Sequence, residues 1–587
     1  MNKDRRRSRR TDIKGDPVGL SKVGNHVQNP TGETEEYSVV VIGAGMGGIY
    51  ALHRFADLGH NVHGFEGADG VGGVWYHNAY PGARVDLESH SYAFMFDPEL
   101  YAGWDWSERY AAQPEILRYL NYVADRLDVR RNLSLNTWVT SADWQPHENK
   151  YLIKTNTGRT VWARYLVMAT GQLSKPRKPD FPGLDDFEGQ WYQTAHWPQT
   201  PVEIAGKRVA LIGTGSSGVQ AATEIAKTAG QLHVLQRTPN YSIPAHNGPA
   251  DTRKKARLNK KVLQLRDESY NSPVGYVMQG FAGKASDFSE EQQQQILESR
   301  WAFGGQTLLG TFSDQGTDID VNNVVAEFVR GKIRDMIDDP ATAEKLMPTS
   351  YPIGIRRLCI DTGYYPIFNQ SNVSLVDLRS EPIEQITKTG IKTRNNEYEV
   401  DLIVFALGFE AFTGALDQAN VRNEFGQQPS DRWKHKPQTH LGVMTHGFPN
   451  LFMLTGAQSP SVLANFFVGN NQHVDFVADI IAHAEKKDAT RIEASLEAER
   501  EWGDHCNEIA APLLRRAVDN YMVHVNKYDG SRYFIPYAGG FDKYVKKVEE
   551  VVSDDYRGFV FTKGLSTGNP EPTVIEGRGR DAVLTAK

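Results

Sequence analysis

Residues 37–66 decide the fold and read YSVVVIGAGMGGIYALHRFADLGHNVHGFE. The apolar run Val39–Ile42 is typical of a strand that is buried on both faces of a sheet. A fingerprint of the form Gly-x-Gly-x-x-Gly follows at once, with Gly43, Gly45 and Gly48. Its first glycine allows a tight turn, its second lets the backbone approach a pyrophosphate, and its third lets helix and strand pack closely. The stretch therefore predicts a dinucleotide-binding βαβ unit.

The same stretch ends in an acid. A helix is expected to run to about Leu58, where Gly59 ends it, and a second strand then reaches Glu66. Glu66 stands 23 residues after Gly43, at the position from which a carboxylate binds ribose hydroxyls. A glycine fingerprint alone would be a weak indication, whereas strand, glycines, helix, strand and terminal acid together are a strong one.

The pattern recurs in residues 207–240, KRVALIGTGSSGVQAATEIAKTAGQLHVLQRTPN. The second fingerprint contains Gly213, Thr214, Gly215, Ser216 and Gly218. Here the second strand ends in Arg237 and Thr238 rather than in an acid. An arginine can form a bidentate pair with a phosphate, so this site selects the 2′-phosphate of NADP over the bare ribose of NAD. The alternative is that Arg237 only caps the edge of the strand.

The two fingerprints predict an α/β protein with two Rossmann-like domains, one for FAD and one for NADPH, because an acid-ended first fold is the usual FAD arrangement. The stretches YLVMATG (165–171) and DLIVFALGFE (401–410) are of the kind that return a chain to such a core. They indicate that the NADPH domain is inserted in the FAD domain, with Asp401 near the flavin. The predicted boundaries are a basic and polar arm (1–36), the first part of the FAD domain (37–175), the NADPH domain (176–395), and the second part of the FAD domain with a C-terminal substrate-loop region (396–587).

A helical insertion is expected within the NADPH domain. Residues 250–345 are rich in lysine, glutamine and glutamate at helical spacing. Ser289 and Gln292 form the start of a capping box. We expect these helices to lie over the site.

Composition and charge exclude several classes of function. The net charge of −7 gives no reason to expect nucleic-acid binding, and the basic run Lys3–Arg10 is interpreted as part of a solvated arm. No apolar run is long enough for a transmembrane helix. The two cysteines, Cys359 and Cys506, lie far apart in the sequence, which fits a reducing cytoplasm. We therefore predict a cytoplasmic monomer or weak homo-oligomer that acts on small molecules, without nucleic acid or membrane as a partner.

Electrons that pass from NADPH to FAD need an acceptor. A disulfide reductase would need a cysteine pair beside the flavin, and this chain has none. No HExxH, paired CxxC or other metal signature offers another acceptor. Oxygen remains, so the protein is either an oxidase that releases peroxide or a monooxygenase that uses it.

A stretch between the two fingerprints favours a monooxygenase. FEGQWYQTAHWP (187–198) resembles the signature Phe-x-Gly-x-x-x-His-x-x-x-Trp-Pro/Asp of type I Baeyer–Villiger monooxygenases. The positions that match in register are Phe187, Gly189, Trp197 and Pro198, whereas Gln193 stands where that family has histidine. Flavin monooxygenases that oxidise amines and sulfides share the opening of this motif but lack its Trp-Pro ending. The resemblance therefore favours ketone oxidation.

Two further motifs support the resemblance, which covers residues 37 to about 560. The stretch GGVWYHNAYPGARVD (72–86) matches a family pattern at Gly73, Trp75 and Asp86. The stretch IRRLCIDTGYYP (355–366) carries a basic pair, Arg356-Arg357, ahead of an aspartate. All three motifs occur in the family's order along the chain.

The resemblance implies a reaction. NADPH reduces FAD, oxygen adds at flavin C4a to give a peroxide, and the peroxide attacks a ketone that is expected to be cyclic or bulky. The adduct rearranges to an ester or lactone. Such chemistry needs a fixed cation in a site that is shut off from water.

The resemblance also implies roles for individual residues. Arg357 occupies the family's catalytic arginine position, and Asp86 its active-site aspartate position, from which a carboxylate would orient the arginine. The alternative for Asp86 is a turn cap. Arg356, where the family usually has lysine, would join Arg237 and Thr238 on the 2′-phosphate.

Two departures from the family pattern bear on function. Gln193 replaces a histidine that is taken to couple domain movement to NADPH binding, and glutamine cannot take a charge. His196 could substitute for it, although the favoured interpretation of His196 is a surface histidine. In AVDNYMVHVN (517–526), Tyr521 stands where relatives have tryptophan, in a loop that shapes the substrate pocket. The alternatives left open are an amine- or sulfide-oxidising monooxygenase, a peroxide-releasing NADPH oxidase, and a flavin pseudoenzyme or nucleotide-binding redox sensor.

Overall fold

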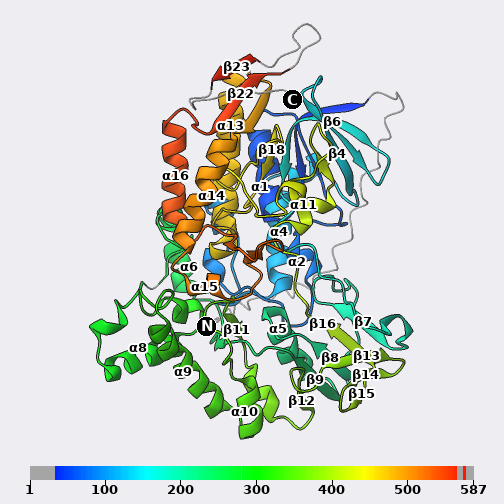
Figure 1. The fold of residues 1–587 in the computed structure, drawn as a ribbon, viewed down its shortest axis with the longest axis vertical. Coiled ribbons are helices and arrows are strands. Elements are labelled where there is room, and N and C mark those ends of the chain that lie inside the picture. The colour runs from blue at the N-terminus through cyan, green and yellow to red at the C-terminus, as the bar shows by residue number, and fades with distance from the viewer. Residues whose placement is uncertain (1–33, 279, 565–572, 577–587) are drawn as a thin grey trace, which may run out of the picture.

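The computed structural model describes residues 34–278, 280–564 and 573–576. The chain forms two α/β lobes, the first at the top of Figure 1 and the second at the bottom. Nearly all of the arm predicted at 1–36 lies outside the described residues. Within the described part of the chain, no helix is long and apolar enough to cross a bilayer.

The first lobe is built on an eight-stranded sheet in the order β17-β4-β5-β6-β1-β2-β3, with β18 paired to β6. Its strands are β1 (Glu35–Ile42), β2 (Val62–Phe65), β3 (Leu133–Ser134), β4 (Val139–Gln145), β5 (Lys150–Thr155), β6 (Thr160–Met168), β17 (Val421–Arg422) and β18 (Leu451–Met453). The central strand β1 runs parallel to β2 and β6, and its apolar run is buried as predicted.

Helices cover this sheet and link it to the C-terminal part of the chain. They are α1 (Met46–Asp57), α2 (Val74–His77), α3 (Pro98–Ala102), α4 (Gln113–Arg126), α11 (Gly414–Gln418), α12 (Pro429–Arg432), α13 (Phe466–Lys486), α14 (Leu496–Ala510), α15 (Leu514–Ala517) and α16 (Phe541–Ser553). α1 packs against α13 beside β1, and α15 lies where the two lobes meet (Figure 1). Two small antiparallel sheets complete this part, β19 (Arg491–Ala494) with β22 (Phe559–Lys563) and β23 (Thr573–Glu576), and β20 (Val523–Val525) with β21 (Arg532–Phe534).

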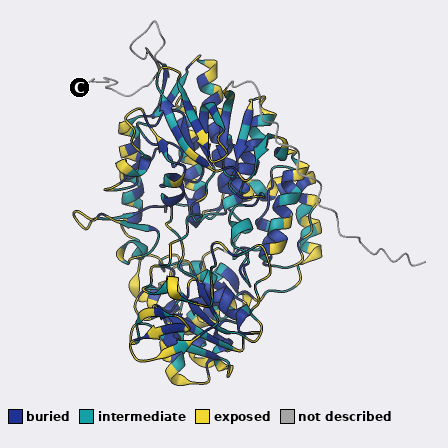
Figure 2. Cartoon of the chain, turned by 90° about the vertical axis from the view of Figure 1, so that its right-hand side faces the viewer, coloured by how far each residue is buried: buried dark blue, intermediate teal, exposed yellow. Residues whose placement is uncertain are grey.

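The second lobe has a five-stranded, all-parallel sheet in the order β12-β9-β8-β16-β7. Its strands are β7 (Gln190–Gln193), β8 (Arg208–Ile212), β9 (Gln231–Gln236), β12 (Val373–Asp377) and β16 (Leu402–Phe405), and α5 (Ser216–Ile225) follows β8. Two smaller sheets belong to this lobe, β10 (Ser242–Pro244) with β11 (Cys359–Asp361), and β13 (Ile383–Thr387) with β14 (Gly390–Thr393) and β15 (Glu397–Glu399). Buried residues fill the interior of both lobes (Figure 2).

The predicted helical insertion is present. It consists of α6 (Thr252–Asn259), α7 (Val262–Tyr270), α8 (Glu290–Phe303), α9 (Ile319–Met336) and α10 (Pro340–Leu346). α8, α9 and α10 lie in the second lobe, whereas α6 and α7 pack against α3, α13 and α16 of the first lobe (Figure 1). α8 begins with the expected capping box, in which Ser289 and the side chain of Gln292 bond each other's backbone.

The prediction that residues 401–410 return the chain to the first sheet is wrong. β16 pairs with β8 of the second sheet, with Leu402 opposite Val209. Asp401 therefore lies at the amino end of a strand in the second lobe, where its carboxylate binds the backbone and side chain of Arg208 at 2.9 and 2.8 Å. The strands that do return to the first sheet are β17, which runs parallel to β4, and β18, which runs parallel to β6.

The glycine fingerprints of the two sheets make the same kind of contact with a neighbouring strand, which explains why residues 401–410 were assigned to the wrong sheet. A Cβ on Gly43 would lie 2.6 Å from the carbonyl oxygen of Ala169, just after β6. A Cβ on Gly213 would lie 2.4 Å from that of Ala406, just after β16. Each fingerprint thus contacts an alanine that directly follows a strand, and the local pattern cannot tell which sheet such a strand joins.

Two adjacent segments connect the lobes, and we call them the linker pair (residues 172–177 and 408–412). The amide of Arg177 donates to the carbonyl of Gly408 at 3.0 Å, and that of Glu410 donates to Lys175 at 2.9 Å. The amide of Phe412 donates to Gln172 at 3.0 Å. The chain therefore enters and leaves the second lobe side by side.

Candidate functional site

A continuous cavity of about 1530 Å³ runs between the lobes and is lined by both glycine fingerprints. It exceeds the roughly 300–1,000 Å³ of a pocket for one drug-sized ligand, so it has room for more than one large molecule. The predicted site residues that line it are Gly43, Gly45, Glu66, Gly73, Trp75, Asp86, Gly213, Thr214, Gly215, Ser216, Arg237, Thr238, Arg356, Arg357 and Tyr521. Asp401 is not among the lining residues, in keeping with its place in the second sheet.

The first fingerprint presents an open helix end to the cavity. Gly45 is the N-cap of α1 and supplies no side-chain cap, so the first amide groups of the helix have no side-chain partner there. A helix N-terminus of this kind attracts a phosphate. A Cβ on Gly73 would lie 3.0 Å from the Cα of Gly45, so these two backbones touch only because both residues lack a side chain. Gly48 does not line the cavity, and a Cβ there would lie 1.9 Å from the carbonyl of Gly43, which is the packing role of a third glycine.

Glu66 closes the same turn. Its carboxylate accepts hydrogen bonds from the amides of Ala44 at 2.7 Å and Ala68 at 2.9 Å. Burial raises the pKa of Glu66, and these backbone donors oppose the shift. The carboxylate oxygens keep further acceptor capacity at the cavity wall, so Glu66 fits the hydroxyls of a ribose.

The second fingerprint repeats this arrangement. Gly215 caps α5 without a side-chain bond, and the space beside its Cα is open. Three predicted phosphate ligands, Arg237, Thr238 and Arg356, line the cavity near this end of the second sheet. The guanidinium of Arg356 stacks on the ring of Tyr351 at 4.8 Å. No carboxylate of the described chain forms an ion pair with either arginine, so both are free to bind an anion.

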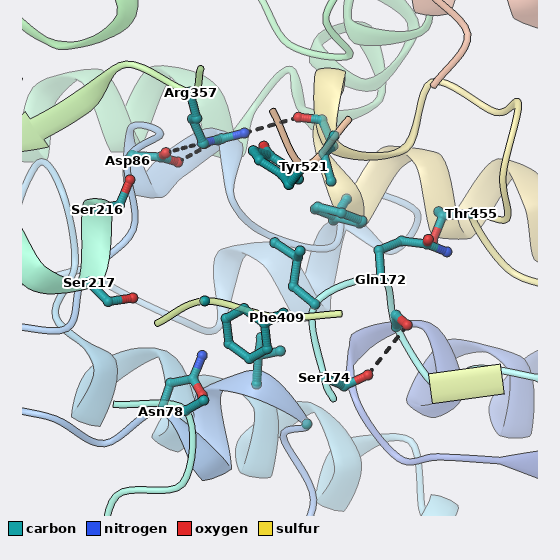
Figure 3. A pocket seen from close by; sticks show the side chains of 18 of the residues that line it. Asn78, Asp86, Gln172, Ser174, Ser216, Ser217, Arg357, Phe409, Thr455 and Tyr521 are labelled. Carbon is teal, nitrogen blue, oxygen red and sulfur yellow. Dashed lines mark hydrogen bonds and ion pairs between the residues drawn. The ribbon is translucent and has the colours of Figure 1, made fainter. Parts of the chain in front are cut away.

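Arg357 and Asp86 meet inside the cavity, 271 residues apart in sequence (Figure 3). Arg357 Nη2 donates to Asp86 Oδ1 at 2.7 Å, and Arg357 Nε donates to Asp86 Oδ2. Arg357 Nη1 donates to the carbonyl of Val462 at 3.0 Å. These bonds fix the plane of the guanidinium.

The pair leaves Arg357 charged and partly available. Burial disfavours its charge, but the attraction and hydrogen bonding of Asp86 outweigh that effect and raise the pKa of Arg357. A guanidinium has five N–H donors, and the structure uses three of them. Its side chain is 40% exposed, and the exposed part faces the cavity.

Tyr521 lies beside this ion pair (Figure 3). Burial raises the pKa of Tyr521, although Arg357 and Arg515 oppose the shift. The phenol therefore stays neutral near pH 7 and can act as a hydrogen-bond donor.

The Gln193 motif (residues 187–198) does not line the cavity, apart from its Ala195-His196 segment. A Cβ on Gly189 would lie 2.8 Å from the carbonyl of Asp401, so this glycine lets β7 start against the second sheet. Trp197 is buried, and its amide donates to His77 of the first lobe at 3.0 Å. The motif therefore passes from one lobe to the other.

Sequence reasoning missed several lining residues. Gln172 lines the cavity, and its buried Oε1 has no hydrogen-bond partner in the described chain. Arg515 lines it too, from α15. Gln172 follows directly on the strand-then-glycine stretch at 165–171, which could have drawn attention to it. Arg515 has no local motif that would indicate its position.

Comparisons with known proteins agree with this architecture. Residues 37–268 match the family model for pyridine nucleotide-disulphide oxidoreductases. The chain is 38% identical over 528 residues to phenazine N-monooxygenase PhzNO1 of Lysobacter antibioticus, covering 89% of this chain and 97% of that protein. It is 36% identical over 529 residues to a Baeyer-Villiger monooxygenase of Pseudooceanicola batsensis, covering 89% and 96%. The solved structure of oxidized steroid monooxygenase bound to NADP superposes with a TM-score of 0.86 at 44% identity, covering 90% and 99%.

Two Rossmann-like lobes that line one cavity are the arrangement of a flavoprotein oxidoreductase that binds two dinucleotides. The relatives then narrow the class. The chain belongs to the family of Baeyer–Villiger and related flavin-dependent monooxygenases.

Proposed function

We propose that the protein is an FAD- and NADPH-dependent Baeyer–Villiger monooxygenase. It inserts one oxygen atom of O2 next to the carbonyl of a ketone, which is cyclic or bulky, and gives an ester or lactone. The observation that carries the proposal is the Arg357–Asp86 ion pair within a cavity that both fingerprints line.

The residues of the first lobe fit FAD. The open end of α1 suits the pyrophosphate, Glu66 suits the ribose, and the unpartnered Oε1 of Gln172 suits a donor group of the bound molecule. FAD that NADPH has reduced supplies the activation of O2. The second lobe fits NADPH, with its 2′-phosphate held by Arg237, Thr238 and Arg356.

Arg357 stabilises the negative charge that develops on the ketone oxygen during attack. Two of its N–H donors remain after its bonds to Asp86 and Val462, and neither is hydrogen bonded to another described residue. A preorganised donor is worth most in a site from which water is excluded. Asp86 holds the guanidinium in place and is therefore a positioning residue.

Tyr521 supplies a neutral hydroxyl on the same side of the cavity. It is suited to donate to the substrate carbonyl or to a ribose oxygen. Because the C-terminal segment 515–522 carries this side chain into the cavity, substrate range depends on that segment.

Gln193 connects the second sheet to the linker pair. Its Nε2 donates to the carbonyl of Arg177 at 3.2 Å, and its own carbonyl accepts from the amide of His196. This contact supports a role in transmitting lobe movement. A neutral amide makes that coupling independent of pH, unlike a histidine.

One observation favours a second candidate. The phenazine N-monooxygenase is named for oxidation at nitrogen, and this chain is 38% identical to it. Heteroatom oxidation requires no oxyanion partner, whereas ketone oxidation does. The bidentate Arg357–Asp86 pair therefore gives ketone oxidation the preference.

We also propose a cytoplasmic protein that is a monomer or weak homo-oligomer. Both cysteines, Cys359 and Cys506, are buried and free, which supports a reducing compartment.

Purified flavoprotein with NADPH and O2 should be offered cyclic, polycyclic and linear ketones, a phenazine and a sulfide. NADPH consumed, peroxide released and products formed are quantified together. Ester or lactone formed in step with NADPH supports the proposal. N-oxide or sulfoxide as the sole product would move the assignment to the second candidate, and peroxide in step with NADPH on every compound would make the protein an oxidase.

A further inference from the structure

Arg515 brings a second guanidinium to the substrate end of the cavity. It belongs to α15 and lines the cavity together with Tyr521 and Arg357. Its Nε donates to the carbonyl of Gly354 at 2.8 Å, three residues before Arg357. The backbone that Arg515 binds is therefore at most about 11 Å of chain from Arg357, and both arginines line the same cavity.

The described part of the chain supplies no counter-charge for Arg515. Among the residues that the structure describes, no carboxylate forms an ion pair with it. Asp86 is engaged by Arg357, and Asp519, the nearest acid along the chain, pairs with Arg532 at 2.6 Å. The neutral Tyr521 phenol supplies no charge either.

The unpaired charge of Arg515 destabilises the folded protein unless an anion binds beside it. Burial lowers the pKa of Arg515, and the nearby Arg357 lowers it further. An arginine nevertheless stays protonated in proteins, so the charge persists in a partly desolvated site. Two cations against one carboxylate leave an excess positive charge beside the reacting centre, and a buried charge without a partner is destabilising.

The free edge of Arg515 fits a carboxylate. With Nε committed to Gly354, both terminal nitrogens remain for a bidentate pair with two oxygens. Amides or esters would accept one bond and leave the charge in place. We propose that the substrate is a ketone that also carries a carboxylate, an oxo acid, and that Arg515 binds this carboxylate while Arg357 faces the carbonyl.

This inference rests on the proposed function, because it assigns the ketone end of the substrate to Arg357. The test uses 4-oxocyclohexanecarboxylic acid against its methyl ester, and a second acid–ester pair with a longer spacer. The variants are Arg515→Leu, Arg515→Lys and a neighbouring control, Arg516→Leu. The side chain of Arg516 bonds the carbonyl of Arg532 and does not line the cavity.

The acid-to-ester ratio of kcat/KM is expected to be at least about tenfold in the unchanged enzyme, since a charged hydrogen-bonded pair contributes that much. Arg515→Leu should lower this ratio about 10- to 100-fold. Arg515→Lys should keep part of the preference because it keeps the charge but not the fork. Arg516→Leu should leave the ratio unchanged.

A separate binding measurement tests the role of Arg515 even if the protein does not form lactones. Titration of the oxidised flavoprotein with each acid, followed by the flavin spectrum, gives a Kd that needs no turnover. Neutral ketones converted to lactones without any acid preference would overturn this inference and leave the proposed function standing. Acid binding that depends on Arg515 in a protein that forms no lactone would overturn the proposed function alone.

Two further results would count against Arg515 as a substrate residue. A loss in Arg515→Leu that is equal for acid and ester would indicate a structural role. An increase of the KM for NADPH, with the acid-to-ester ratio intact, would place Arg515 on the coenzyme.

Discussion

Replacement of Arg357 tests the assigned chemistry most directly. Arg357→Ala removes the two N–H donors that remain after its bonds to Asp86 and Val462. Loss of one oxyanion donor costs about 10²–10³ in kcat, and the effects of two such donors are not additive. We therefore expect ketone oxygenation to fall by about 10³ or more. Arg357→Lys keeps the charge, but an ammonium group cannot form a bidentate pair with Asp86 and also donate to the substrate. We therefore expect ketone oxygenation to fall by about 10².

Two half-reactions separate this effect from a loss of coenzyme binding. Anaerobic mixing with NADPH in a stopped-flow instrument measures flavin reduction, and product analysis under air measures oxygenation. Flavin reduction should stay within about tenfold of the unchanged protein in both variants, because hydride transfer needs no oxyanion donor. Arg356→Ala is the matched comparison, and it should raise the KM for NADPH while product per NADPH stays the same.

The reasoning is refuted if Arg357→Ala still forms ester at the original rate. It is also refuted if flavin reduction and oxygenation fall by the same factor, since Arg357 would then act on NADPH binding.

Four further outcomes are expected. Arg237→Ala should lower the preference for NADPH over NADH about 10- to 100-fold in kcat/KM, and an unchanged ratio would assign coenzyme selection elsewhere. Gly43 has φ of +101° and a carbonyl oxygen 2.6 Å from the position of a Cβ, so Gly43→Ala should cost about 2–4 kcal/mol in urea unfolding and deplete bound flavin. Gly59→Ala is its control, with φ of +85° and open space, and should cost only about 1 kcal/mol. Asp401→Asn should leave flavin content unchanged and cost less than about 1 kcal/mol near pH 7, because its ion pair is largely exposed. Hydrogen bonds from its arginine partner lower the pKa of the Asp401 carboxyl, so this small stabilisation is present above about pH 4 and disappears as the pH falls through the folded-state pKa. Gln193→His should introduce a break near pH 6–7 in the rate of flavin reduction, and identical pH profiles would argue against a coupling role for this position.

The nucleotide-binding parts of the fold were predictable because they depend on local geometry. Gly43 and Gly213 have φ of +101° and +109°, which residues with a side chain rarely adopt. Strand, turn and helix follow within a few residues of each fingerprint, so the pattern is complete in one stretch of sequence. The helical insertion was predictable for the same reason, from spacing and a capping box.

The placement of residues 401–410 was not predictable from such a pattern. In both sheets the fingerprint contacts an alanine that directly follows a strand, so the local pattern would allow β16 in either sheet. Only the pairing of Leu402 with Val209, nearly two hundred residues away in sequence, decides between them. Contacts at that separation depend on the whole fold.

Within the site, resemblance located what chemistry alone would not. Asp86 and Arg357 are 271 residues apart, and the sequence around neither residue indicates that they form an ion pair. The family motifs linked them. Arg515 lies outside every motif, on a four-residue helix whose place in the cavity depends on the path of the C-terminal segment.

The linker pair makes the second lobe an insertion whose two ends lie next to each other. The chain departs near Arg177 and comes back near Gly408, and those two residues are hydrogen bonded to each other at 3.0 Å. Because the ends of residues 178–407 lie side by side, this insertion imposes little chain-entropy penalty on the first lobe, against which its helices α6 and α7 pack. Chimeras joined at Arg177 and Gly408 should exchange coenzyme preference between relatives. The first lobe, including the contacts of Glu66, should keep its native structure.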